Sequence, residues 1–242
     1  MDINEARSVL APTGTLRAGI NMSNFLLVSA TDSTGRPDGL SPSVARALAS
    51  ALDVDVELVL FDSPGVLADA VNDDMWDIAN IAFEPERATH ISFSQPYILI
   101  DANFQVRAGS ALTENQQMNS PDVTIILYDR SAYDLWLKEN FTKARYLRVD
   151  SIQESHDRFY SGEGDVLASL KPKLIADNAE GYQIINAPFT AIKQSVGISK
   201  RIEQALPLIN KVLEELLSSG EIQAILEKFG VADRLSLPTL SS

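Results

Sequence analysis

The sequence contains no cysteine and only two histidines, and these shortages exclude several kinds of chemistry. Without cysteine there is no disulfide bond, no thiolate nucleophile and no cysteine-ligated zinc site. His90 and His156 are too few for a metal site built from several imidazole ligands. We therefore expect neither a metal nor another cofactor. The lack of cysteine does not distinguish one cellular compartment from another.

Basic residues are scarce compared with acidic ones. Twenty lysines and arginines stand against 33 aspartates and glutamates, which gives a formal net charge of −13. Nucleic acids and anionic membrane surfaces both bind basic protein surfaces, so we expect neither as a partner. No apolar run approaches the ~20 residues of a membrane-spanning helix. The first residues lack a signal-peptide pattern, so the protein is either cytoplasmic or a periplasmic protein recorded without its signal peptide.

The remaining composition is that of an ordinary globular protein, with 45% hydrophobic and 22% charged residues in a chain of 242. This length suits one large domain or two domains of ~100–150 residues each. In the first part of the chain, extended runs alternate with helical patterns, at residues 16–20, 41–52, 54–61, 63–75 and 77–83. This alternation predicts a parallel α/β lobe.

A second alternation of strands and helices runs from residue 123 to residue 185 and predicts another lobe of similar plan. The chain then returns through an extended run at 191–198 and ends in helices at 200–217 and 221–229. We therefore predict that residues 1–106 and 195–242 form lobe 1 and that residues 107–194 form lobe 2, inserted into it. Two connecting segments between lobes allow a hinged cleft to close around a small ligand.

Three local predictions concern two helix caps and one loop. Ser41, followed by Pro42, is predicted to cap the helix at 41–52, and Ser131 the helix that begins at residue 132. A strand that runs into such a capped helix presents free N–H groups and a favourable dipole to an anion. After the strand at 165–169, the segment 170–172 is predicted to be a loop.

The stretch WDIANIAFEPERATHISFSQPY, residues 76–97, reads as a short buried strand, a turn and a second extended piece. Arg87 lies in the turn, where its five donors in a planar fork suit a carboxylate. The alternative is that Arg87 forms a solvated surface pair with Glu84 or Glu86, and such pairs contribute little. For Glu84 itself, a solvated turn carboxylate is favoured over a proton-transfer group.

Seven segments together resemble the solute-binding proteins of ABC transporters, in the polar amino-acid family with the type II periplasmic fold. They are LRAGI, GRPDGLSPSVARALASAL, WDIANIAFEPER, FSQPY, SAYDLWL, GEGDVLASL and LLSSGEIQAILEKFG. The resemblance extends from about Leu16 to Gly230. It implies two α/β lobes, each with a central sheet flanked by helices, joined by two hinge segments around a ligand cleft.

The resemblance also implies ligand-binding residues. In this family the arginine at the position of Arg87 binds the ligand α-carboxylate. The loop just before it contributes backbone and side-chain contacts, which map to Asn80 and Ala82. The first loop contributes Asn24 and an aromatic platform at Phe25, whose alternative role is lobe core.

The second lobe is expected to contact the ligand carboxylate through the helix N-terminus at Ser131, but it departs from the family pattern. Many members have an aspartate for the ligand ammonium at the position where this chain has Leu170, followed by Lys171. We hypothesise that Lys171 favours a second anionic group, unless it is simply a surface lysine. Arg130 replaces the usual glycine and is a candidate second anion clamp. Asp129 could replace the missing ammonium partner.

These patterns favour a binding protein, not an enzyme. It would capture a small carboxylate-bearing ligand, an amino acid or an organic acid, and deliver it to an ABC transporter permease, with a monomer as the expected state. One alternative is a ligand sensor that has no transporter. Another is an enzyme on the same fold, such as a dehydratase of the cyclohexadienyl type, for which Glu84 and Lys171 are the available proton-transfer groups.

Overall fold

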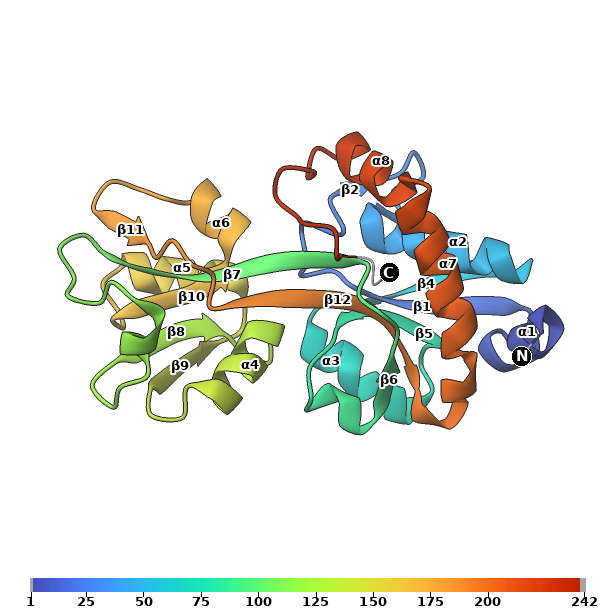
Figure 1. Cartoon of the computed structure of the whole chain (residues 1–242), viewed down its shortest axis with the longest axis horizontal. Helices are drawn as coiled ribbons and strands as arrows, with labels where there is room; N and C mark the ends of the chain where they lie inside the picture. The colour runs from blue at the N-terminus through green and yellow to red at the C-terminus, as the bar shows by residue number, and fades with distance from the viewer. Residues whose placement is uncertain (1, 240–242) are drawn as a thin grey trace. The chain divides into compact units, whose positions relative to one another are not determined.

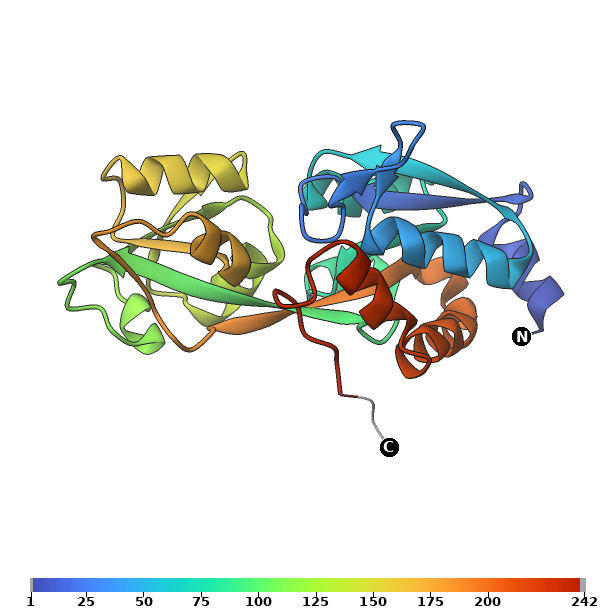
Figure 2. The same cartoon turned by 90° about the horizontal axis from the view of Figure 1, so that it is seen from above.

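The computed structural model describes residues 2–239, and these divide into two compact units. Unit 1 runs up to Leu99 and resumes at Lys193, while unit 2 comprises Ile100–Ile192. Strands β7 (Ile98–Arg107) and β12 (Thr190–Ser199) carry the chain from one unit to the other (Figure 2). The first boundary lies before the predicted one at residue 106, because residues 102–106 of β7 already pair with a strand of unit 2.

Unit 1 is built on a mixed sheet with the strand order β4-β1-β5-β12. The first three strands are parallel, and β12 is antiparallel to β5. A short strand, β6, pairs with β12. The other elements of unit 1 are α1 (Ile3–Leu10), β1 (Thr15–Asn21), β2 (Ala30–Thr31), β3 (Pro37–Asp38), α2 (Leu40–Leu52), β4 (Asp55–Phe61), α3 (Pro64–Asp69), η1 (Ala70–Asp73), β5 (Ile78–Ala82), η2 (Arg87–Thr89), β6 (Ile91–Phe93), η4 (Lys200–Ala205), α7 (Leu206–Ser218) and α8 (Glu221–Lys228).

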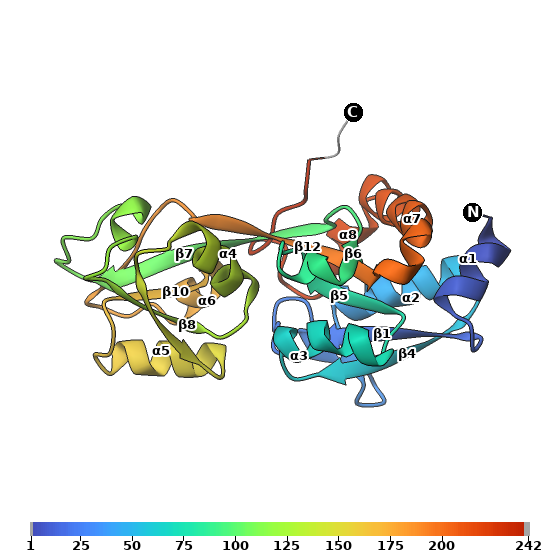
Figure 3. The ribbon, with the colours of Figure 1, turned by 90° about the horizontal axis from the view of Figure 1, so that it is seen from below.

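Helices cover both faces of this sheet, with α3 on one face and α2, α7 and α8 on the other (Figures 1 and 3). The α3 face buries Trp76, whose indole Nε1 donates to the carbonyl of Leu67 at 3.0 Å. The predicted Ser41 cap is wrong, because α2 begins one residue earlier, with Gly39 as its cap. Gly39 has φ +143°, and a Cβ there would lie 2.5 Å from the carbonyl oxygen of Leu27. The close packing of these two segments therefore places glycine at the cap and Ser41 inside the helix.

Unit 2 has the strand order β7-β10-β8-β9, in which β7 is antiparallel to β10 and the other three strands are parallel. Strand β11 pairs with the outer edge of β7. The elements of unit 2 are η3 (Asn115–Met118), β8 (Thr124–Tyr128), α4 (Ala132–Asn140), β9 (Arg145–Val149), α5 (Ile152–Tyr160), β10 (Val166–Leu170), α6 (Lys171–Ala176) and β11 (Tyr182–Ile184).

Helices α5 and α6 share one face of this second sheet. Phe159 of α5 and Leu174 of α6 pack on Ile126 and Leu167 of the strands, and all four are buried. The segment 170–172 was predicted to be a loop, but α6 begins at Lys171, directly after β10. Proline is compatible with the first turn of a helix, so Pro172 does not delay the start of α6.

The C-terminal helical segment is also divided differently from its prediction. Residues 200–205 form the 3₁₀ helix η4, within which Ile202 has non-helical dihedral angles, and α7 begins at Leu206. Pro207 in the first turn of α7 explains this start, because proline lacks the N–H that a continuous helix would need there. The last helix, α8, agrees with its prediction within one residue.

Candidate ligand-binding residues in two units

Arg87 is the first residue of η2, five positions after the last residue of β5, and is 6% exposed. Its guanidinium Nη1 donates to the carbonyl oxygen of Ala82, the last residue of β5, at 2.9 Å. Glu84, in the same turn, is also only 6% exposed. Burial of both residues contradicts the solvated setting expected for the Arg87 pair and for the Glu84 carboxylate. The Arg87 guanidinium is buried and anchored to the end of its strand.

Asn80 belongs to a buried hydrogen-bond chain beneath this turn. The Tyr97 hydroxyl donates to Asn80 Oδ1 at 3.0 Å and lies 3.4 Å from the Ser41 hydroxyl. Burial raises the pKa of Tyr97, and hydrogen bonds with Ser41 and Gln194 oppose the rise. Asn80 is 1% exposed, and its Nδ2 has no hydrogen-bond partner within residues 2–239. An unpaired buried amide of this kind costs about 1–3 kcal/mol.

Asn24 and Phe25 lie in the loop that follows β1. Asn24 orders this loop, since its Oδ1 accepts from the Leu26 N–H at 3.3 Å and its carbonyl accepts from the Val28 N–H at 2.9 Å. Phe25 is partly exposed. Strands β1 and β5 are parallel neighbours, so the loops at their carboxyl ends share one edge of the sheet. The structure thus brings the four predicted residues that follow β1 or belong to β5, together with Arg87, to one end of unit 1.

In unit 2, Ser131 caps α4 as predicted, and its Oγ accepts from the Asp134 N–H at 3.1 Å. Arg130, which precedes it, has φ +52°, a left-handed conformation that glycine adopts without strain and other residues rarely adopt. The Arg130 N–H donates to Asp134 Oδ2 at 2.9 Å. Asp134 therefore holds both residues of the turn in place: its carboxylate accepts from the Arg130 N–H, and its own N–H donates to the Ser131 hydroxyl.

A second anchor of this turn is Arg148 of β9. Its guanidinium lies 2.9 Å from Oδ1 of Asp134, whose side chain is 3% exposed, and 3.7 Å from Asp129 Oδ1. The Asp129 side chain is 44% exposed. The candidate ammonium partner, Asp129, is thus already close to a guanidinium.

Lys171 lies next to an acidic residue that the sequence analysis did not single out. Its Nζ is 3.5 Å from Oδ2 of Asp101 on β7, and the two side chains are 39% and 36% exposed. The antiparallel register of β10 and β7 pairs Leu170 with Ala102. Lys171, the residue after Leu170, is therefore next to Asp101, the residue before Ala102. The signal in the sequence was that Asp101 is the one ionisable residue in the apolar run ILIDANFQV.

Behind this end of unit 2, a buried polar chain links three elements. His156 of α5 places Nε2 2.9 Å from the Ser169 hydroxyl and Nδ1 3.0 Å from Asp177 Oδ2. Lys173 of α6 also pairs with Asp177. Burial lowers the pKa of His156 to about 4, against the opposing effect of Asp177. The order of groups is that of a serine-hydrolase triad, but Ser169 and His156 are fully buried, which suits a structural link.

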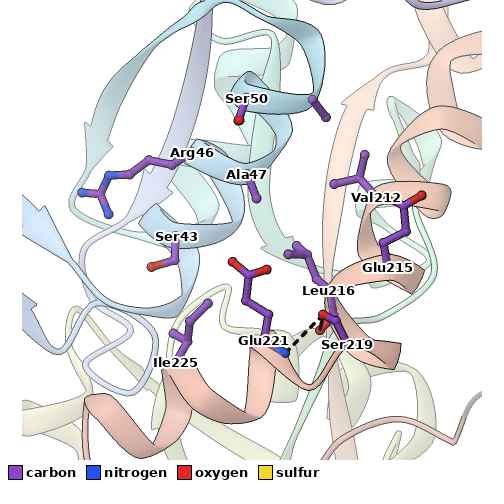
Figure 4. Close-up of a pocket in the computed structure, with 11 residues that line it drawn as sticks. Ser43, Arg46, Ala47, Ser50, Val212, Glu215, Leu216, Ser219, Glu221 and Ile225 are labelled. Atoms are coloured by element: carbon purple, nitrogen blue, oxygen red, sulfur yellow. Dashed lines mark hydrogen bonds between the residues drawn. The ribbon is translucent and has the colours of Figure 1, made fainter.

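The structure also shows a hollow of about 710 Å³ on the helical face of unit 1, between α2, α7 and α8 (Figure 4). Its lining includes Arg46, Glu215 and Glu221, and Arg46 is directed away from Glu221 toward its own partner, Asp38. None of the predicted ligand-binding residues lines this hollow.

Within the described part of the chain, no cluster of three or more histidine, aspartate or glutamate side chains is arranged to hold a metal ion. Among those same residues, no helix combines the length and apolar character needed to cross a membrane.

Comparison with known proteins identifies the family. The profile of bacterial extracellular solute-binding proteins, family 3, matches residues 16–232. The glutamine-binding protein of an ABC transporter from Bacillus subtilis is 23% identical over 154 residues, or 63% of this chain and 56% of that protein. The chain thus aligns with little more than half of that relative. The L-cystine-binding protein of Escherichia coli is 23% identical over 226 residues, 91% of this chain and 84% of that protein.

Solved structures show the same fold. An ancestral amino acid-binding protein, described as a precursor of cyclohexadienyl dehydratase, superposes with a TM-score of 0.72 at 24% identity, over 94% of this chain and 98% of that one. At this identity the likeness establishes the fold alone. The expected α/β architecture of the periplasmic-binding-protein type is confirmed. Because the profile covers most of its length, the chain belongs to the bacterial extracellular solute-binding proteins of family 3.

Proposed function

We propose that the protein captures a small carboxylate-bearing solute, an amino acid or a closely related organic acid, for import by an ABC transporter. The observation that carries the proposal is Arg87. Its guanidinium is buried at the carboxyl end of β5 and fixed to Ala82, at the sheet edge where α/β proteins bind their ligands. A planar fork held in this way is suited to the two oxygens of a carboxylate.

The family and its relatives support the same ligand class, since the two curated relatives are described as binding glutamine and L-cystine. We propose that Asn24, Phe25, Asn80 and Ala82 contribute further contacts from unit 1. From unit 2, we propose contacts by Arg130, Ser131 and Lys171.

We further propose that β7 and β12 act as the hinge segments, that the protein works as a monomer outside the cytoplasm, and that it performs no catalysis. The family description, extracellular solute-binding proteins, supports this location. A binding function needs complementary groups and no proton-transfer machinery.

A thermal-shift screen tests the proposal. The protein is purified, unfolded and refolded to remove carried-over ligand, then heated with L-amino acids, dicarboxylates, keto acids and sugars. A ligand present at about 100 times its dissociation constant adds roughly 2.7 kcal/mol to the free energy of unfolding. For a chain of this size that raises the midpoint by a few degrees.

The decisive variant is Arg87→Lys, which keeps the positive charge but removes the planar fork. We expect at least tenfold weaker binding of the carboxylate ligand, measured by calorimetry. The control is Arg36→Lys, an exposed arginine of the same unit, which should bind the ligand as the wild type does. Unchanged affinity in a folded Arg87→Lys protein, or no binding of any carboxylate by the wild type, would contradict the proposal.

A further inference from the structure

We propose that Asp101 is the residue that binds the ammonium group of the ligand, and that Lys171 is its resident counter-ion until the ligand arrives. This inference rests on the proposed function and specifies the ligand class as one with an ammonium group beside its carboxylate. It answers a problem raised by the sequence, which has leucine at position 170 and no acid following it.

The position of Asp101 supports this role. Asp101 lies near the amino end of β7, which is antiparallel to β10, and Lys171 lies just beyond the carboxyl end of β10. Strand β8, the parallel neighbour of β10, leads into the turn at Arg130 and Ser131. All four residues are thus at the same edge of the unit 2 sheet. The carboxylate of Asp101 thus lies on the strand that neighbours β10, at the same edge of the sheet.

The strand environment of Asp101 is otherwise apolar. Its neighbours Ile100 and Ala102 are fully buried, while the Asp101 side chain is 36% exposed. An aspartate is unfavourable in strands and contributes nothing to the buried core on either side of it. Its side chain is therefore kept at the exposed sheet edge, where a ligand can reach it.

The pair with Lys171 is of the kind that a ligand can replace. The 3.5 Å separation is long, and more than a third of each side chain is exposed, so the pair contributes little to stability. A ligand that carries both an ammonium and a carboxylate can exchange this one weak pair for two. Its ammonium takes Asp101, and Lys171 becomes available to an anionic group of the ligand. An organic acid without an ammonium group would leave Asp101 without a cationic partner when Lys171 turns to the ligand.

The other acids at this edge are less suitable. Asp134 is buried and held by Arg148 in a close ion pair, and it also accepts the Arg130 N–H. Asp129 is more exposed, but the same Arg148 guanidinium lies 3.7 Å away. Arginine remains charged at all physiological pH values, so it opposes an ammonium at Asp129. By contrast, Lys171 has a long, flexible side chain that can turn away from Asp101.

The test compares each amino acid with the keto acid that lacks its ammonium group. Calorimetry measures L-glutamate against α-ketoglutarate, L-alanine against pyruvate and L-leucine against α-ketoisocaproate. The wild type is expected to prefer the amino acid in at least one pair. In Asp101→Asn, that preference should fall at least tenfold, because amino-acid binding weakens while keto-acid binding stays within about threefold.

Lys171→Met gives the complementary result. Both ligand classes then lose the lysine contact, but only the amino acid gains an unpaired Asp101, so the ratio of amino-acid to keto-acid affinity should increase. The matched control is Glu163→Gln, which removes one negative charge from another exposed ion pair of unit 2, with Arg158. It should leave the preference unchanged. Thermal unfolding without ligand should differ little among all three variants, since both ion pairs are exposed to solvent.

The outcomes separate this inference from the proposed function. An unchanged amino-acid preference in Asp101→Asn overturns the inference and leaves the proposed function standing. A wild type that prefers the keto acids also overturns it, in favour of an anion site at Lys171. A wild type that binds neither class contradicts the inference and the proposed function together.

Discussion

The two units hold polar groups at the carboxyl edges of their sheets in different ways. In unit 1 these groups are buried and hydrogen-bonded, as in the chain from Ser41 through Tyr97 to Asn80, and Arg87 is anchored to a backbone carbonyl. In unit 2 the corresponding edge combines a buried carboxylate, Asp134, with an ion pair that is partly open to solvent, Asp101 with Lys171. The buried polar chain of unit 2 lies behind that edge and includes His156.

This difference bears on how recognition and stability are divided. Buried, hydrogen-bonded groups cannot move without loss of stability, so the edge of unit 1 is preorganised. Half-exposed ion pairs contribute little to stability and can exchange partners, so the edge of unit 2 is adaptable. Changes at the unit 1 edge should therefore affect stability and binding together. In unit 2, changes at the edge should affect binding, and changes in the buried chain should affect stability.

The largest effect is expected from His156→Ala. His156 connects Ser169 of β10 with Asp177 at the end of α6, and its loss leaves a cavity and unsatisfied polar groups. We expect a loss of about 3–4 kcal/mol in the free energy of unfolding, measured with urea. The control is the other histidine, His90→Ala, which is exposed and should stay within about 0.5 kcal/mol of wild type. A loss of stability in His156→Ala no larger than that in His90→Ala would show that the buried polar chain does not stabilise unit 2.

The pH dependence of wild-type stability should also report on His156. Burial lowers the folded-state pKa of His156 to about 4, below its ordinary value of 6.5, with Asp177 opposing the shift and Lys173 reinforcing it. Between these two values the unfolded chain binds a proton that the folded chain does not. Stability is therefore complete above pH 6.5 and decreases as the pH falls toward 4, by up to about 3 kcal/mol.

The measurement is urea unfolding at intervals from pH 4.5 to pH 7.5, with His156→Gln as the reference because it cannot titrate. The difference between wild type and variant isolates this histidine from the carboxylates that titrate nearby. A constant difference across the range would mean that His156 keeps an ordinary pKa in the folded protein.

Much of the fold could be predicted from the sequence because the signals are local. Apolar periodicity located the strands and helices of both units, and Ser131 caps α4 as predicted. The errors arose where distant packing decides. Gly39 caps α2 because the carbonyl of Leu27 leaves no room for a side chain there. The first unit boundary follows from the pairing of β7 with β10, which no local pattern reveals.

The candidate site shows the same limit. Arg87, Asn80 and Ser131 lie close in sequence to recognisable strands and caps, so their places could be predicted, while their roles stay predictions. Asp101 approaches Lys171 across 70 positions of the chain, through the register of two strands. A sequence alone does not provide that register, and the apolar run around Asp101 indicated only a strand.

A smaller effect is expected from Tyr97→Phe in unit 1. Without the hydroxyl, Asn80 loses the donor to its Oδ1 as well as having no partner at Nδ2. We expect a loss of about 1–2 kcal/mol in the free energy of unfolding, together with weaker ligand binding. The control is Tyr182→Phe in unit 2, whose partly exposed hydroxyl makes a longer bond of 3.3 Å and should matter less. Loss of stability with unchanged binding would contradict the preorganised edge.

The smallest effect concerns backbone strain, and it compares the units directly. Arg130 in unit 2 and Asp53 in unit 1 share the same left-handed φ of +52°. Glycine relieves the strain at each position but costs more backbone entropy on folding, so Arg130→Gly and Asp53→Gly should each be stabilising by no more than about 0.5–1 kcal/mol. Because Asp53 lies at the C-terminal end of α2, away from the ligand edge, its variant should bind the ligand as the wild type does. Arg130→Gly should gain similar stability and lose affinity if Arg130 clamps the anion, as proposed. Equal binding by both variants would remove Arg130 from the site, and the strain at position 130 would then have no functional explanation.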